Sequence, residues 1–135
     1  MMNKFNLKII TPEKTFFDGE CVQLTVRTTE GNVGIMAGHI NYTALLPAGP
    51  MRIKYEDGNS RDAAVSNGVV SVYDGNVTVL GNAVEWADEI DSERAKNAEQ
   101  RARERLKAAQ SAKEMDIASQ KLKRALNRLS VSGKM

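Results

Sequence analysis

Arginine side chains at helical spacing in the last third of the chain are the residues whose types and positions suggest chemistry. Arg94 and Arg101 are seven residues apart, and Arg124 and Arg128 are four apart, so each pair shares one face of a helix. A guanidinium group offers a planar fork of N–H donors that matches phosphate oxygens. Folding the two helices together can bring these groups onto one phosphate chain. The alternative is a solvated basic face, and the spacing alone does not decide between them.

Positive charge accumulates in the same part of the chain. Residues 85–135 carry twelve Lys/Arg against nine Asp/Glu, whereas residues 1–84 carry seven against eight. From Ile117 onward the chain has no acidic residue. We expect this segment to meet an acidic partner. The net charge of +2 and the pI near 8.7 argue weakly against a dedicated nucleic-acid binder.

Other reactive groups are sparse. The chain has one histidine, His39, and one cysteine, Cys21, so it lacks a histidine pair or a cysteine set for a metal ion. His39 lies in a glycine-rich stretch with no obvious nucleophile beside it. Neither a Gly-x-x-x-x-Gly-Lys-Ser/Thr loop nor a Gly-x-Gly-x-x-Gly fingerprint occurs. We therefore expect no catalytic residue and no metal site, and any nucleotide must be held by side chains.

Residues 1–86 are expected to form an antiparallel β-sandwich or flattened barrel. Apolar and polar residues alternate in the first strand and again around Leu24, and the turn residues Asp57-Gly58 and Asp74-Gly75-Asn76 predict hairpins. The glycine-rich segment 30–40 is expected to be a loop. Further strands are expected at 42–46, 51–55, 61–65, 69–73 and 77–80.

Residues 87–135 follow the period of a helix and are expected to form a two-helix hairpin. Asp91 is placed to cap the first helix, and Ser111 with Glu114 fits a capping box for the second. The connection contains neither Gly nor Pro, so nothing in it forbids a single continuous helix. Alanine-rich stripes bury little apolar area, so the packing of the hairpin is expected to be marginal. A ligand can switch an element that is held so weakly. The stripes are Ala95, Ala98, Ala102, Leu106 and Ala109, then Met115, Ala118, Leu122, Ala125 and Leu129.

Four ordered segments carry a family resemblance that covers almost the whole chain. The first, Ile90-Asp91-Ser92-Glu93-Arg94-Ala95, matches the Ile/Leu-Asp-x-x-Arg-Ala motif and resembles the ε subunit of bacterial F-type ATP synthases. The other segments are 31–39, similar to the family's Gly-Glu-Leu-Gly-Ile-x-Pro-Gly-His loop, 75–80, similar to its strand before the join, and 123–129, similar to its last helix. The chain departs from the family at Asn32 and Ala37, where Glu and Pro are usual, and at Ser66-Asn67-Gly68, where Ser-Gly-Gly is usual.

The resemblance implies a non-catalytic rotor subunit that couples proton translocation to ATP synthesis. It implies contacts of the sandwich with the γ subunit and the c-subunit ring, and a regulatory hairpin that is folded or extends toward the catalytic β and α subunits and obstructs ATP hydrolysis. It also implies a peripheral position on the cytoplasmic face of the bacterial cell membrane, with no insertion into the membrane and no nucleic acid. The implied c-ring contact loop contains Gly31, Asn32, Gly38 and His39.

The same resemblance implies that the folded hairpin binds ATP, with or without Mg²⁺, as a regulatory ligand and not as a catalytic cofactor. Position-by-position matching gives the site as Glu85, Ile90, Asp91, Arg94, Ala95, Arg101, Arg124 and Arg128. The arginines are expected to hold the phosphates, and the other residues to face the adenosine.

Two other functions fit the bare residues. One is a β-sandwich interaction module whose basic helices bind nucleic acid, although few aromatic residues are present there to stack on bases. The other is an independent ATPase, which would need a phosphate-binding loop and a general base.

Overall fold

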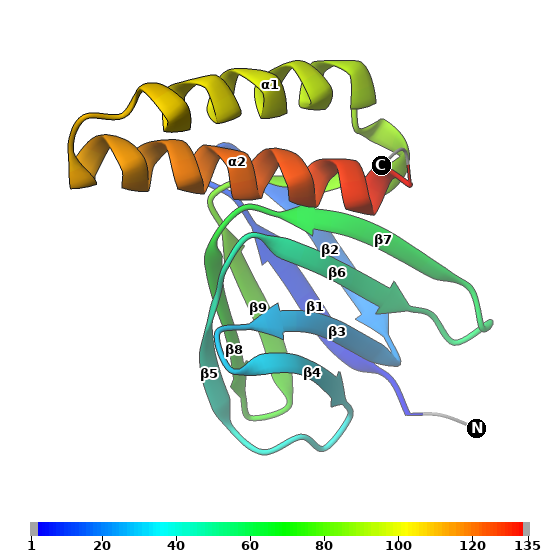
Figure 1. Ribbon diagram of the computed structural model, residues 1–135. Coiled ribbons are helices and arrows are strands. Elements are labelled where there is room, and N and C mark those ends of the chain that lie inside the picture. The colour runs from blue at the N-terminus through cyan, green and yellow to red at the C-terminus, as the bar shows by residue number, and fades with distance from the viewer. Residues whose placement is uncertain (1–2, 134–135) are drawn as a thin grey trace. The chain divides into compact units, whose positions relative to one another are not determined.

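The computed structural model describes residues 3–133, and the chain divides into two compact units between Trp86 and Ala87 (Figure 1). The first unit is a β-sandwich and the second is helical, as the sequence predicts. The sandwich strands are β1 (Phe5–Ile10), β2 (Thr15–Cys21), β3 (Gln23–Thr28), β4 (Gly31–Met36), β5 (Tyr42–Leu46), β6 (Gly49–Lys54), β7 (Ser60–Val65), β8 (Gly68–Tyr73), β9 (Asn76–Gly81) and β10 (Val84–Trp86).

The strands form two sheets of five strands each. One sheet has the order β2-β1-β9-β8-β5 and the other β10-β7-β6-β3-β4. Neighbouring strands are antiparallel except β1 and β9, which are parallel. The predicted sandwich is confirmed, with one parallel pair that strand spacing alone does not reveal.

The core lies between the two sheets and follows from the alternation of apolar and polar residues. In β1, Leu7 and Ile9 have no exposed surface, whereas Asn6 and Lys8 face solvent. Leu24 and Ile53 contribute in the same way from the other sheet. Phe16 of β2 packs against Trp86 of β10, with ring centroids 4.6 Å apart.

Three strands differ from the prediction. Segment 31–36 is not loop but β4, because Val33 and Ile35 alternate inward and the whole segment pairs in register with β3. β2 has no apolar alternation and is set by its pairing with β1. β10 is three residues long and is held by β7. In all three cases the partner strand, and not local propensity, decides the structure.

The predicted hairpin turns are confirmed. Asp74 and Gly75 both have positive φ, 51° and 81°, between the paired residues Tyr73 and Asn76. This is the backbone that a two-residue turn requires to match the strand twist. Gly58 likewise has a φ of 89° in the turn between β6 and β7.

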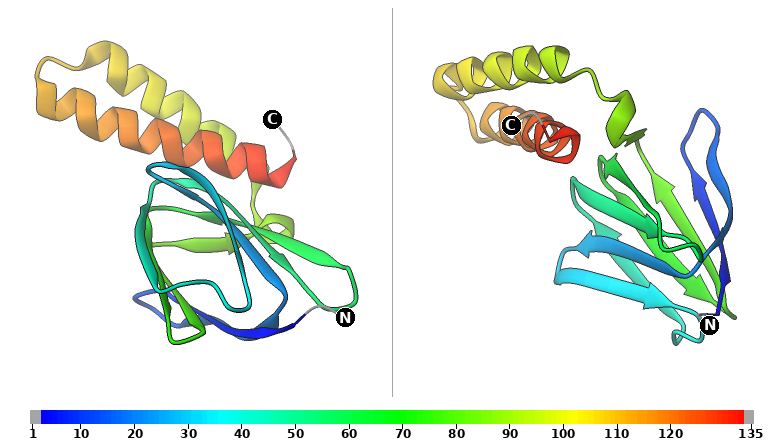
Figure 2. Two further views of the ribbon diagram at one scale, coloured as in Figure 1. Left: turned by 90° about the horizontal axis from the view of Figure 1, so that it is seen from below. Right: turned by 90° about the vertical axis from the view of Figure 1, so that its right-hand side faces the viewer.

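The helical unit contains the short 3₁₀ turn η1 (Ala87–Glu89), α1 (Ser92–Ala108) and α2 (Ala112–Ser132). α1 and α2 lie side by side in antiparallel directions, so the structure selects the hairpin and not the continuous helix (Figure 2). The stripes are buried at Ala95, Ala102, Ala118, Ala125 and Leu129. Met115 belongs to the predicted second stripe but is 53% exposed. Residues 112–117 are all exposed, so the buried face of α2 begins only at Ala118.

Candidate functional site

The start of α1 is built by the predicted cap. Asp91 Oδ1 accepts a hydrogen bond from Arg94 N at 3.0 Å, and Ala95 N donates to Asp91 O at 3.0 Å. These bonds fix the backbone around Ile90, which is half-buried, and leave the Arg94 side chain exposed. Ala95, the next residue along the helix, is fully buried.

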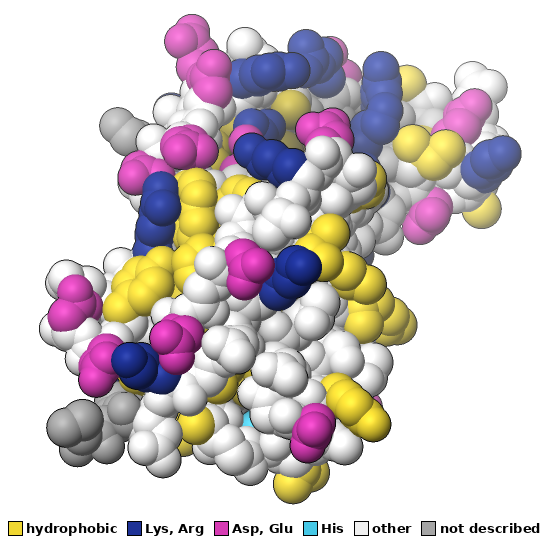
Figure 3. Space-filling model, turned by 180° about the vertical axis from the view of Figure 1, so that it is seen from behind, with side chains coloured by type: hydrophobic (Ala, Val, Ile, Leu, Met, Phe, Trp, Pro, Cys, Tyr) yellow, Lys and Arg dark blue, Asp and Glu magenta, His cyan; other side chains and the backbone are white. Residues whose placement is uncertain are grey.

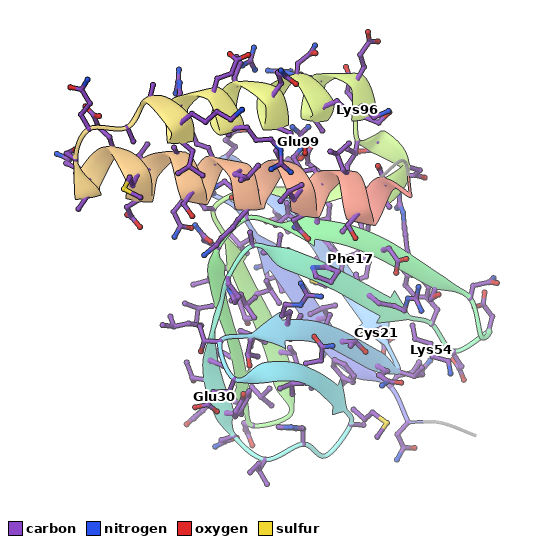
Figure 4. The ribbon with its side chains drawn as sticks, in the orientation of Figure 1. Phe17, Cys21, Glu30, Lys54, Lys96 and Glu99 are labelled. Carbon is purple, nitrogen blue, oxygen red and sulfur yellow. The ribbon has the colours of Figure 1, made fainter. Side chains whose placement is uncertain are left out.

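The arginines of α1 divide into paired and unpaired groups. Arg103 donates to Glu99 Oε2 from Nε at 3.0 Å and from Nη2 at 2.8 Å, so its charge is already matched (Figure 4 labels Glu99). Arg94 and Arg101 are exposed, and neither makes an ion pair within residues 3–133. Their guanidinium groups are available to an anion.

Arg124 of α2 differs from Arg94 and Arg101 in being partly buried. Its side chain is half-buried, and its Nε atom is buried without a hydrogen-bond partner in the part of the chain that the structure describes. A buried charged donor without an acceptor is costly, so such atoms normally have a protein, water or ligand partner. Arg128, one turn further along α2, is also half-buried and has interactions of its own.

The hairpin brings most of the predicted ATP-site residues into one unit. α2 packs along α1 and also contacts η1, which directly precedes Ile90 and Asp91. The arginines of both helices and the cap of α1 therefore belong to one compact body. Glu85 instead lies in β10, opposite Ala64 of β7, and is part of the sandwich unit. In Figure 3, Lys and Arg side chains lie interspersed with Asp and Glu side chains over the upper part of the view.

The residues of the predicted c-ring contact loop occupy the β3–β4 hairpin and the turn after it. Gly31 has a φ of 120° and starts β4, and Asn32 follows it opposite Arg27. Gly38 has a φ of 82°, and His39 Nδ1 lies 2.8 Å from Ile40 O. Apart from His39, which is half-buried, these four residues are exposed.

A row of apolar side chains on the sandwich was not found from the sequence. Leu45 is opposite Val69, Val69 is opposite Leu80, and Leu80 is opposite Ile10, so the four residues cross β5, β8, β9 and β1 in register. Leu45 is 62% and Leu80 51% exposed. We call these four residues the apolar row. Ile10 and Val69 are half-buried, so Leu45 and Leu80 provide most of the exposed apolar surface of the row, and such a surface favours a protein contact.

Among the described residues there is neither a metal-binding cluster nor a membrane-spanning helix. Residues 3–133 contain no cluster of three or more His, Cys, Asp or Glu side chains that would hold a metal ion. Neither α1 nor α2 has the length and apolar character of a membrane-spanning helix.

Comparison with known proteins identifies the family. Residues 4–87 match the family model described as ATP synthase, Delta/Epsilon chain, beta-sandwich domain, and residues 88–133 match the one described as ATP synthase, Delta/Epsilon chain, long alpha-helix domain. The chain belongs to the ATP synthase delta/epsilon chain family. An ATP synthase epsilon chain of Ruminococcus albus is 48% identical, covering 98% of this chain and 99% of that protein. One of Caldanaerobacter subterraneus is 39% identical, covering 99% and 97%.

Solved structures share the fold of this family member. A chain of the Euglena gracilis mitochondrial ATP synthase, in a structure of OSCP, F1 and c-ring, superposes with a TM-score of 0.84 at 22% identity, covering 96% of this chain and 82% of that one. A chain from the central stalk and c-ring structure of the Tetrahymena thermophila enzyme gives a TM-score of 0.71 at 19% identity, covering 97% and 98%.

The structure explains one departure from the family pattern. Asn67 stands where a Gly is usual, and its φ is 64°. Asparagine tolerates this left-handed backbone better than most residues, so the turn keeps its shape. Gly68, which is retained, is required for another reason: a Cβ there would collide with the backbone oxygen of Leu80.

Proposed function

We propose that this chain is the epsilon subunit of a bacterial F-type ATP synthase, a non-catalytic rotor subunit of the central stalk. The epsilon chains of Ruminococcus albus and Caldanaerobacter subterraneus support this assignment, because each aligns over nearly its whole length. The two structural neighbours come from assemblies of F1 with the c-ring and of the central stalk with the c-ring. The sandwich contacts the γ subunit and the c-ring, and the complex is held at the cytoplasmic face of the cell membrane. The subunit couples proton translocation to ATP synthesis.

The apolar row supports a role in assembly. Its exposed Leu45 and Leu80 would be unfavourable on a free-standing protein and suit a surface that a larger partner covers. Mixing the purified chain with γ and c-ring preparations tests the assignment, since an epsilon subunit co-elutes with them. Failure to join the stalk would contradict the rotor role without bearing on nucleotide binding.

We further propose that the closed hairpin binds ATP, with or without Mg²⁺, and that the extended hairpin reaches the catalytic β and α subunits and inhibits ATP hydrolysis. The observation that carries the ATP site is the buried, unsatisfied Nε of Arg124. A phosphate oxygen supplies the missing acceptor, and Arg94 and Arg101 provide exposed guanidinium groups from the other helix. Arg128 adds positive charge one turn along α2.

The remaining predicted residues give the site its shape. The cap at Asp91 and the buried Ala95 hold the backbone near Ile90, where the adenosine is expected. Glu85 belongs to the set only through the family pattern. Because the phosphate-binding arginines come from both helices, ATP stabilises the closed hairpin by RT ln(1 + [ATP]/Kd), about 2.7 kcal/mol at a hundredfold excess over Kd.

Isothermal titration of the full chain with ATP tests this site. Arg124→Ala is expected to weaken binding about tenfold or more, because hydrogen bonds to charged groups contribute about 1.5–3 kcal/mol. Arg103→Ala is the matched control, since it removes the same charge from a residue that is paired with Glu99. Equal affinities in the two variants would count against Arg124 as a ligand. No binding at millimolar ATP would rule out the sensor and leave the rotor assignment intact.

A further inference from the structure

Two of the three residues in the turn between α1 and α2 are good helix formers. Ala109, Gln110 and Ser111 separate the two helices, and none is glycine or proline. Ala109 is extended, with φ −64° and ψ 131°, and so is Ser111, with φ −144° and ψ 160°. Alanine and glutamine are among the better helix formers. Local propensity therefore favours helix through the turn, and some other interaction must hold the chain in the hairpin.

Two side-chain hydrogen bonds meet that need. Ser111 Oγ accepts from Glu114 N at 3.1 Å, and Glu114 Oε2 accepts from Gln110 N at 2.8 Å. The second bond reaches one residue further back than in the predicted capping box, where the carboxylate would bond to Ser111 N. It thereby fixes the middle residue of the turn as well as the start of α2. We call these two bonds the latch.

Neither bond fits a continuous helix. In a continuous helix, the N–H groups of Gln110 and Glu114 would donate to main-chain oxygens four residues earlier, and the side-chain acceptors would have no function. The continuous form would run from Ser92 to Ser132, about 60 Å at 1.5 Å per residue. What it gives up is packing between α1 and α2, and most of the buried residues there are alanines.

We propose that Ser111 and Glu114 act as a latch that selects the hairpin over one continuous helix. The latch involves only residues of the turn, so it acts in the absence of ATP. Both side chains are exposed, so a partner that binds the Glu114 carboxylate competes directly with Gln110 N–H and releases the hairpin. A single cap bond shifts the balance between the two forms by about fivefold.

Distances between spin labels on Lys96→Cys and Lys123→Cys in the full chain distinguish the two forms. Both positions are exposed, and they lie 14 and 13 residues from Gln110 (Figure 4 labels Lys96). Neighbouring helices are 8–10 Å apart, so in the hairpin the labels lie within about 25 Å. In the continuous helix they are about 40 Å apart. Cys21 is 1% exposed and remains unlabelled in the folded chain.

The variants separate the latch from helix propensity. Ser111→Ala and Glu114→Ala each remove one bond, and the double variant removes both. Gln110→Ala is the matched control, because it raises helix propensity in the turn but keeps the backbone N–H that Glu114 accepts. Ser111→Asp retains a capping oxygen and should restore the hairpin. Each label pair is followed through a trifluoroethanol titration, which favours helix, so a shift is measurable even where the hairpin dominates in buffer.

In the double variant, the ratio of the long-distance to the short-distance population is expected to rise by at least about fivefold at matched trifluoroethanol. In Gln110→Ala and Ser111→Asp this ratio is expected to stay unchanged. An equal rise in Gln110→Ala would mean that propensity, and not the latch, sets the balance. Unchanged distances in the double variant throughout the titration would overturn the proposal. The distances are measured without ATP, because ATP is itself proposed to favour the closed hairpin.

Discussion

Gly68→Ala is expected to destabilise the sandwich severely, because the new methyl group has no space. Real Cβ atoms essentially never approach another heavy atom closer than 3.0 Å, and a Cβ at this position would lie closer than that to Leu80 O. It would also lie 3.1 Å from the Cα of Gly81. Both neighbours are backbone atoms of β9, the strand paired with β8. They cannot rotate away as a flexible side chain does, so the two strands must separate locally.

The loss in the free energy of unfolding follows from the separation of the two strands. Overpacking of a rigid site costs about 1–3 kcal/mol. Parting β8 from β9 at the Gly68–Gly81 pair also weakens the adjoining ladder hydrogen bonds, each contributing about 1 kcal/mol. We therefore expect a loss of about 3 kcal/mol in the free energy of unfolding. With a urea m-value of about 1–3 kcal/mol/M, the midpoint falls by about 1–3 M.

Urea unfolding followed by tryptophan fluorescence measures this loss. Trp86 is the single tryptophan, is 8% exposed, and lies in the sandwich unit. Gly34→Ala is the matched control: its Cβ would meet only the Nε2 atom of Gln23, at 3.1 Å, which a flexible side chain can withdraw. We expect that variant to stay within about 1 kcal/mol of the parent. Equal midpoints for the two variants would refute the steric argument.

Two further predictions concern titrating groups of the sandwich. Burial raises the pKa of the Cys21 thiol to about 11, so Ellman's reagent at pH 8 should modify it only as the chain unfolds, in parallel with the Trp86 transition, and rapid modification of the native protein would contradict this. Hydrogen bonds of 2.7 and 3.0 Å from Arg52 lower the pKa of Asp62. Its contribution to stability is therefore complete above the ordinary carboxyl pKa near 3.9 and is lost as the pH falls through the lowered value. Because the side chains of Arg52 and Asp62 are 62% and 39% exposed, Asp62→Asn should cost at most about 1 kcal/mol at pH 7, and the cost should shrink as the pH falls below the ordinary carboxyl pKa. A cost that does not change with acidification would disprove the ion pair's role.

Much of the fold is local enough to be predicted from the sequence. The alternation in β1 and the turn at Asp74-Gly75 identify strands and hairpins, because each depends on residues a few positions apart. The caps at Asp91 and Ser111 are predicted for the same reason, since an N-cap bond joins residues three apart. The arginine spacing and the segment 90–95 are also features of the sequence alone, and they indicate the candidate site and the family.

What the sequence alone could not give depends on contacts between distant residues. β2, β4 and β10 are strands because a partner strand pairs with them, and the apolar row exists only because the register of β5, β8, β9 and β1 aligns four residues spread from Ile10 to Leu80.

The sequence by itself determined where strands give way to helices, how each helix begins, and which residues carry the positive charge. The tertiary structure decided that α1 and α2 fold back on each other, although their connection prefers helix. The reason is that propensity acts through neighbours along the chain, whereas the choice between hairpin and continuous helix balances the Ser111 and Glu114 hydrogen bonds and the packing of two helices against main-chain bonds. The hydrogen bonds are local, but the packing joins residues far apart in the sequence, and only the tertiary structure shows that the two together outweigh the continuous helix.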